Sequence, residues 1–407
     1  MNALEIRASV SLASIFALRL FGLFLILPVF AVYAQTIPGG NDATLVGIAL
    51  GIYGLTQAVL QIPFGAASDR WGRKPVITAG LIVFAAGSFI AALATDITWT
   101  IVGRSIQGAG AISAAVTAFI ADSTRDQHRT KAMALVGVSV GLTFAASLVL
   151  APLLFDSIGV RGLFALTGVL VVSAIGVLWW VVPDAPPKVK PTTTQNTVGA
   201  MFDAQLLRLH FGIFALHTVL MAMFVVIPPL LIERGSLQLS AHWMVYLPVV
   251  LLSFLLMWKP LVIAEHRAML RRLFLCSIAL VLAAQLGFLL RGDALIWMAL
   301  WLLVFFTGFN ILEACLPSLV SRIAPASAKG LALGIYNTSQ AFGLFAGGAL
   351  GGAIAARWGS GAVFVFAAIA MAVWLLVALG MREVAVAAEG DPLPDLGRIT
   401  TEIIRSK

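Results

Sequence analysis

The sequence predicts an all-α integral membrane protein, and three observations support this fold class. Hydrophobic residues make up 60% of the 407 residues and charged residues only 11%, whereas about 25% is usual in soluble domains. The mean hydropathy is +1.01. Apolar runs recur along the chain at about the 20 residues that a helix needs to cross a bilayer. They are too long and too uniform for the alternating strands of a membrane barrel.

Twelve such runs are predicted to be transmembrane helices. They cover residues 12–34, 43–66, 75–95, 97–121, 131–154, 160–183, 208–232, 240–263, 269–290, 294–320, 330–356 and 360–381. A proline- and threonine-rich polar stretch after the sixth run reads as a linker. We therefore expect an N-terminal six-helix bundle at 1–183, a cytoplasmic linker at 184–207, a C-terminal six-helix bundle at 208–382 and a cytoplasmic tail at 383–407, too short for a further domain.

The two halves show a weak internal similarity. The segment KAMALVGVSVGL from Lys131 aligns with KGLALGIYNTSQ from Lys329, so each precedes the fifth run of its half. Paired halves with a site between them near the bilayer midplane are typical of secondary transporters.

The basic residues predict which side each loop faces. Nineteen of the 26 Lys and Arg residues fall in one set of loops and only four in the other. Because cytoplasmic loops carry the excess of Lys and Arg, both termini are predicted to be cytoplasmic. The net charge of +8 then points to anionic membrane lipids as partners, not to nucleic acid.

Several functions are disfavoured by what the sequence lacks. Its two cysteines, Cys276 and Cys315, lie in apolar runs and form neither a disulfide framework nor a metal motif. No lysine follows a glycine, so the phosphate-binding loop of ATP-driven pumps is absent. No enzyme motif occurs either. We expect no enzyme activity, metal or cofactor, and energy drawn from an ion gradient.

The loop between the second and third runs carries a specific pattern. It reads GAASDRWGRK and combines an acid, bases and two glycines at fixed spacing: Gly65, Asp69, Arg70, Gly72, Arg73 and Lys74. This loop resembles the G-x-x-x-D-R-x-G-R-K signature of the major facilitator superfamily. Arg104 and Gln107, in the sequence RSIQGAG, resemble the superfamily's R-x-x-Q-G-x-G element. Together they imply the major facilitator fold over nearly the whole chain.

Finer similarities place the chain near the drug/proton antiporter-like branch of the superfamily, in a bacterial inner membrane. Two departures are visible. The branch's Gly-Pro in the fifth span is Ala151-Pro152 here, and residues 264–267 no longer carry the loop pattern in the second half.

The resemblance implies that the loop is a gate. Asp69 would lie at the N-terminus of span eleven in the outward-facing state, where the helix dipole favours an anion. Arg73 would pair with Asp122 at the end of span four. Opening toward the cytoplasm would break both contacts.

Four ionisable residues within the runs are candidates for proton coupling: Glu313, Arg104, Arg19 and His217. Charged groups in the bilayer interior are costly and usually face a cavity or a partner. Glu313 is the first candidate for the proton carrier. For each residue a structural hydrogen-bonding role is the alternative. Arg104 also shares a small-residue helix face with Gly108 and Ala111.

Polar residues and one aromatic residue on the spans are candidates for lining a cavity, with structural hydrogen bonding as the alternative. They are Phe24, Tyr53, Gln57, Gln61, Gln107, Asn310, Asn337 and Gln340.

The sequence therefore indicates a monomeric secondary transporter that exports small apolar or cationic compounds in exchange for protons. One alternative is a proton-coupled transporter of a polar metabolite such as a sugar or amino acid. The other is a non-transporting membrane receptor.

Overall fold

The computed structural model describes residues 1–184, 202–267, 269–290, 294–325 and 329–382. Every regular element in these ranges is a helix. Most of the predicted linker and the predicted tail at 383–407 lie outside the described residues. Nine segments of the described chain are long and apolar enough to cross a membrane.

The N-terminal helices are α1 (Ala3–Phe24), α2 (Leu27–Ala34), α3 (Ala43–Trp71), α4 (Arg73–Leu93), α5 (Ile97–Ala109), α6 (Ser113–Asp122) and α7 (Asp126–Trp180). Three of these helices, α1, α3 and α5, begin at a polar side-chain cap. Asp42 accepts a hydrogen bond from the Thr44 amide and Asp96 from the Trp99 amide. Such side chains satisfy amide groups that have no partner within the helix.

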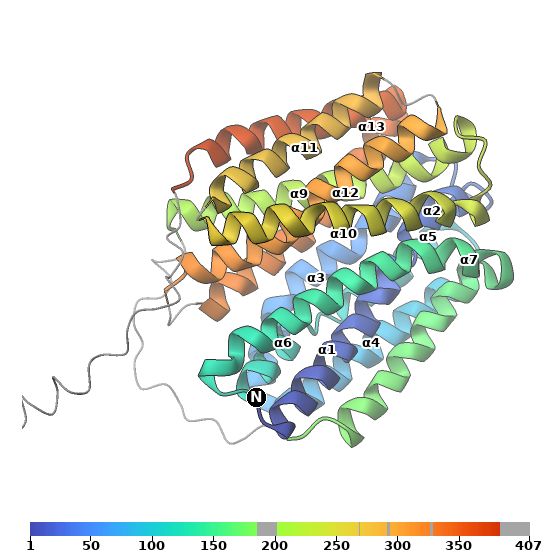
Figure 1. Ribbon diagram of the computed structural model, residues 1–407. Coiled ribbons are helices and arrows are strands. Elements are labelled where there is room, and N and C mark those ends of the chain that lie inside the picture. The colour runs from blue at the N-terminus through green and yellow to red at the C-terminus, as the bar shows by residue number, and fades with distance from the viewer. Residues whose placement is uncertain (185–201, 268, 291–293, 326–328, 383–407) are drawn as a thin grey trace, which may run out of the picture.

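The C-terminal helices follow the same pattern of long apolar segments. They are α9 (Ala204–Glu233), the short η1 (Leu239–Ala241), α10 (Trp243–His266), α11 (Leu270–Leu290), α12 (Leu295–Ile323) and α13 (Lys329–Leu379). Figure 1 shows them, coloured yellow-green to red, beside the blue to green N-terminal helices.

Two helices are too long to cross a bilayer once, and each turns at a glycine. Helix α7 has 55 residues and α13 has 51, while about 20 residues span the hydrocarbon core. Gly159 (φ 61°, ψ 178°) and Gly359 (φ 79°, ψ 176°) interrupt them with a conformation that favours glycine. Figure 1 shows α7 turning back on itself. The two breaks therefore divide each helix at an equivalent place.

The predicted fourth run at 97–121 is not one helix. It is broken between α5 and α6 at residues 110–112. The expected small-residue face through Arg104, Gly108 and Ala111 therefore ends at the break. Gly108, before the break, lies close to α3, where a Cβ atom would meet the Thr56 hydroxyl and the backbone carbonyl of Tyr53.

Helices α3 and α13 join the N-terminal and C-terminal groups through glycines. Gly47 lies against the backbone of Gly348, and Gly51 against the backbone of Phe345, leaving no room for a Cβ atom. Further along, Ile62 is 67% exposed, and a Cβ on Gly334 would meet no neighbouring atom within 4 Å. The two helices are therefore tightly packed where α3 begins and separate toward its end.

Candidate functional site

The loop between α3 and α4 is organised around Arg73. The positive φ of Gly72 (95°) lets α4 begin directly after α3. The Arg73 guanidinium contacts Asp69 Oδ1 at 2.8 Å and Asp122 Oδ2 at 2.8 Å, and donates a hydrogen bond to Ser68. The side chain is only 9% exposed. Arg73 thus ties the end of α3 to the end of α6, and the contact expected with Asp122 is present.

The other loop residues lie nearer the surface. Lys74 pairs with Asp184 at 2.7 Å and lies over the Trp179 ring, while Arg70 is exposed. Residues 326–328, which precede α13, lie outside the described residues. The expected position of Asp69 at the start of span eleven therefore stays a prediction.

Sequence reasoning missed a second ion pair at the same end of the molecule. Glu5 is buried and accepts hydrogen bonds from the Arg125 amide at 3.0 Å and from Arg125 Nε at 2.9 Å. These hydrogen bonds and the carboxylate charge raise the pKa of Arg125. The signal available in the sequence was the capping box of Asn2 and Glu5 at the start of α1.

Both buried arginines of the N-terminal helices lie near Tyr53. The Arg104 guanidinium donates hydrogen bonds to the backbone carbonyls of Ala49 and Leu50 and to Gln107 Oε1. Gln107 in turn donates to Ser88. These contacts fit the structural hydrogen-bonding role that the sequence left open as an alternative, and a coupling role for Arg104 stays a prediction.

Arg19 completes this polar cluster. It donates hydrogen bonds to Ser113 Oγ at 3.0 Å and to Gln57 Oε1 at 3.2 Å. Arg19 and Arg104 place their guanidinium carbons 5.5 and 5.1 Å from the centre of the Tyr53 ring. Gln61 is buried close by in sequence, one helical turn beyond Gln57, and neither atom of its amide has a hydrogen-bond partner in the described chain.

A second polar group lies between α9, α12 and α13. His217 Nδ1 is 3.7 Å from Glu313 Oε1, and the Gln340 amide is 2.7 Å from His217 Nε2. The Glu313 side chain is 27% exposed. Asn310 donates instead to Ser253 of α10, and Asn337 is half-buried. The structure thus brings Glu313, His217 and Gln340 together but not Asn310.

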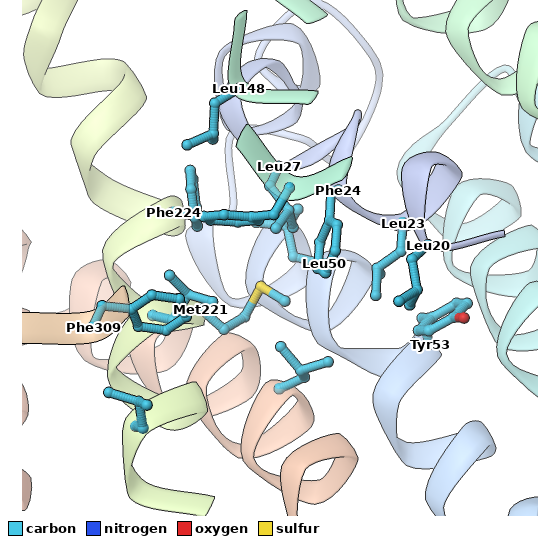
Figure 2. Packing of buried hydrophobic residues seen from close by; sticks show 14 of the residues in the cluster. Leu20, Leu23, Phe24, Leu27, Leu50, Tyr53, Leu148, Met221, Phe224 and Phe309 are labelled. Atoms are coloured by element: carbon cyan, nitrogen blue, oxygen red, sulfur yellow. The ribbon is translucent and has the colours of Figure 1, made fainter. Parts of the chain in front are cut away.

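An aromatic cluster lies next to this polar group and involves both groups of helices. Phe144 of α7 has its ring centroid 5.0 Å from Phe24, 5.9 Å from both Phe306 and Phe309, and 6.4 Å from Phe224. Figure 2 shows Phe24 of α1, Met221 and Phe224 of α9, and Phe309 of α12 gathered in one region. Phe309 also lies 5.9 Å from the His217 ring.

Two hollows occur elsewhere in the described structure. One of about 280 Å³ is lined by Gln35, Asn41 and Glu233 near the tight end of α3. One of about 460 Å³ lies between α9 and α13, lined by His210, Phe211 and Phe342. None of the predicted cavity residues lines either hollow. In the described ranges, no group of three His, Cys, Asp or Glu side chains could hold a metal ion.

Long apolar helices, a basic loop between two of them and ionisable groups buried among them are typical of a polytopic membrane transporter. The chain belongs to the Major Facilitator Superfamily, whose family model matches residues 12–347 and 265–405.

Similarities to individual transport proteins support this family assignment. The chain is 43% identical to the inner membrane transport protein YajR of Escherichia coli (strain K12), over 93% of this chain and 84% of that protein. It is 25% identical to the multidrug resistance protein MdtH of Aeromonas hydrophila, over 83% and 85% of the two chains. A solved bacterial homolog of the human lysosomal transporter Spinster, inward-facing and occupied, has the same fold, with a TM-score of 0.76 at 13% identity, covering 97% and 100%.

Proposed function

We propose that the protein is a proton-coupled exporter of small apolar or cationic compounds that works by alternating access, in the drug/proton antiporter-like branch. The observation that carries this proposal is the Glu313–His217 pair inside the membrane, beside an aromatic cluster that joins the two groups of helices. A carboxyl group in such a place can take up and release a proton as its surroundings change. Aromatic rings form an apolar surface for cargo.

The topology proposed with this function has twelve membrane crossings in two six-helix bundles. Division of α7 at Gly159 and of α13 at Gly359 gives four crossings. Helices α1 with α2, and α5 with α6, form one crossing each. With α3, α4 and α9 to α12 the total is twelve. The even number agrees with both termini lying in the cytoplasm, where basic loops meet anionic lipid. A single chain suffices for this arrangement, so we propose a monomer.

With this orientation, the helices are packed at the outer side and separated at the cytoplasmic side. The glycine contacts of α3 with α13 lie at the outer end, whereas Ile62 and Gly334 lie toward the cytoplasm. This arrangement supports an inward-facing state. The Arg73–Asp122 pair is nevertheless intact, contrary to the expectation that inward opening breaks it. We therefore propose that Arg73 stiffens the N-terminal bundle throughout the cycle.

The names of the relatives support transport of a solute but do not identify which compound is transported. YajR is named only as a transport protein, and MdtH as a multidrug resistance protein. The polar-metabolite alternative needs amide and charged groups that face cargo. The amides of Gln57, Gln61 and Gln107 are buried, so the structure offers it less support.

The test is transport by purified protein in liposomes with an imposed pH gradient, across a panel of apolar, cationic and polar compounds. We expect an apolar or cationic compound to accumulate against its gradient and to release protons from wild-type protein. Glu313→Gln should bind that compound but lose the proton response. Proton release that is unchanged in Glu313→Gln would overturn the carrier role.

A further inference from the structure

The break between α5 and α6 leaves a helix N-terminus buried in the middle of a membrane span. Helix α6 starts at Ser113 without a side-chain cap, and Ala111, Ile112 and Ser113 are buried. The first amide groups of a helix have no partner within it. Interrupted transmembrane helices often direct such amide groups toward an anionic ligand.

Arg19 lies at this helix end, which makes the end more positive still. Its NH1 group donates to Ser113 Oγ at 3.0 Å, and the residue has no exposed surface. A helix N-terminus carries partial positive charge and disfavours a cation. The arrangement of a guanidinium against an uncapped helix start is therefore unfavourable unless a negative charge compensates both.

No acidic residue of the N-terminal half can supply that charge. Arg104 adds a second buried guanidinium beside the same Tyr53 ring. Every Asp and Glu before residue 185 falls near the end of a helix or, for Asp156, beside the Gly159 break in α7. They are Glu5, Asp42, Asp69, Asp96, Asp122, Asp126, Asp156 and Asp184. Two buried cations without a counter-charge are costly in the bilayer interior.

The same cluster contains donors that the described chain leaves unpaired. Arg19 Nε, the Tyr53 hydroxyl and the Gln61 amide are buried and have no hydrogen-bond partner among the described residues. Each unpaired buried group carries a desolvation cost. Arg19 Nε and the Tyr53 hydroxyl can both donate a hydrogen bond, and two positively charged guanidinium groups lie beside them. An acceptor at this place is therefore favoured if it is negatively charged.

We propose that Arg19, Tyr53 and the N-terminus of α6 bind one small monovalent anion, either a halide or a small free carboxylate. The anion accepts hydrogen bonds from Arg19 Nε and the Tyr53 hydroxyl and neutralises the helix end. Arg104 contributes its charge through space because its own donors are engaged. This site belongs to the N-terminal helices and is separate from the Glu313–His217 pair. It is closed to solvent in this conformation, so the anion exchanges as the protein moves.

Tyr53→Phe is the sharpest variant, because it removes only a hydroxyl that has no protein partner. Tyr246→Phe is its matched control, since the Tyr246 hydroxyl is also buried and unpaired but lies on α10. The full-length protein is purified in detergent in sodium gluconate, whose six-carbon anion is much larger than chloride or acetate. It is then equilibrated with sodium chloride or sodium acetate at constant ionic strength. Thermal unfolding then gives the apparent affinity for each anion.

We expect chloride or acetate to raise the unfolding temperature of wild type and of Tyr246→Phe alike. Tyr53→Phe should bind that anion about tenfold more weakly, and Arg19→Gln should lose the response. In gluconate, Tyr53→Phe should be at least as stable as wild type, because an unpaired buried hydroxyl has gone. A response to chloride identifies a halide site, and a response to acetate alone identifies a carboxylate site. Stabilisation by neither anion, or equal stabilisation of Tyr53→Phe and wild type, would overturn the proposal. No proton gradient is involved, so the result is independent of the coupling test on Glu313.

Discussion

His217 and Glu313 face each other from α9 and α12, with 3.7 Å between Nδ1 and Oε1. His217 Nδ1 also lies 3.2 Å from the Ile213 carbonyl, and the Gln340 amide approaches Nε2 at 2.7 Å. These contacts fit a neutral imidazole with its proton on Nδ1, because an amide N–H can donate only to an unprotonated nitrogen. With the Gln340 amide nitrogen toward Nε2, the proton on Nδ1 lies toward the Ile213 carbonyl, on the side of the ring that faces Glu313.

Gln340→Leu should remove the hydrogen bond to His217 Nε2. His217 Nε2 would then be buried without a donor, at a cost of about 1–3 kcal/mol in the free energy of unfolding. We expect a lower unfolding temperature in detergent and weaker substrate-induced proton release in liposomes. Asn337→Leu, on the neighbouring turn of α13, is the control and should change neither by as much. Equal effects of the two variants would show that Gln340 does not position His217.

The Arg73–Asp122 contact should behave as a coupled pair. Arg73→Ala and Asp122→Ala should each lower the free energy of unfolding, and the double variant should cost less than the sum of the two. We expect a coupling energy of about 0.5–3 kcal/mol from the double-mutant cycle. Arg73→Ala should cost more than Asp122→Ala, since Arg73 also contacts Ser68 and Asp69. Strictly additive effects would argue that the pair does not join the start of α4 to the end of α6.

Features of the site that depend on a short stretch of sequence could be predicted, whereas features that depend on three-dimensional packing could not. The Arg73–Asp122 contact was expected from the resemblance. The loop pattern identifies Arg73, and Asp122 stands at the end of the predicted fourth span, so both positions could be read directly from the sequence. The lengths of the apolar runs likewise indicated where the membrane-spanning helices lie. The break between α5 and α6 was missed because residues 110–112 are Gly-Ala-Ile and lie inside a run long enough for one span.

The aromatic cluster could not be predicted for a different reason. Phe144, Phe24 and Phe309 come from distant parts of the chain, and only their packing in three dimensions brings them together. The similar conformations of Gly159 and Gly359 are likewise invisible in the weak internal similarity. Glycine is common throughout such helices, and its φ value cannot be inferred from the sequence alone.

Gly348→Ala should disturb the packing of α3 against α13. The added Cβ would meet the carbonyl oxygen of Gly47, and the backbone there cannot move without separating the helices. We expect greater labelling, by a membrane-impermeant thiol reagent, of a cysteine introduced at Asn41 on the proposed outer side. Gly334→Ala is the matched control on the same helix, since its Cβ meets nothing within 4 Å. It should stabilise the protein by about 0.5–1 kcal/mol through helix propensity. Equal labelling of both variants would argue that the glycine contact does not close the outer side.

Phe144 should act as a barrier between the Glu313–His217 pair and the proposed outer side. Its ring contacts one phenylalanine of the N-terminal helices and three of the C-terminal helices. Phe144→Ala removes these contacts and leaves a cavity, which typically costs about 3–5 kcal/mol in a well-packed core. Water in that cavity would connect Glu313 to the outside, so we expect proton leak in liposomes without substrate. Phe288→Ala is the matched control, because the Phe288 ring stacks on Phe364 entirely within the C-terminal helices. It should be destabilised without leaking protons, whereas a leak-free Phe144→Ala would place the barrier elsewhere.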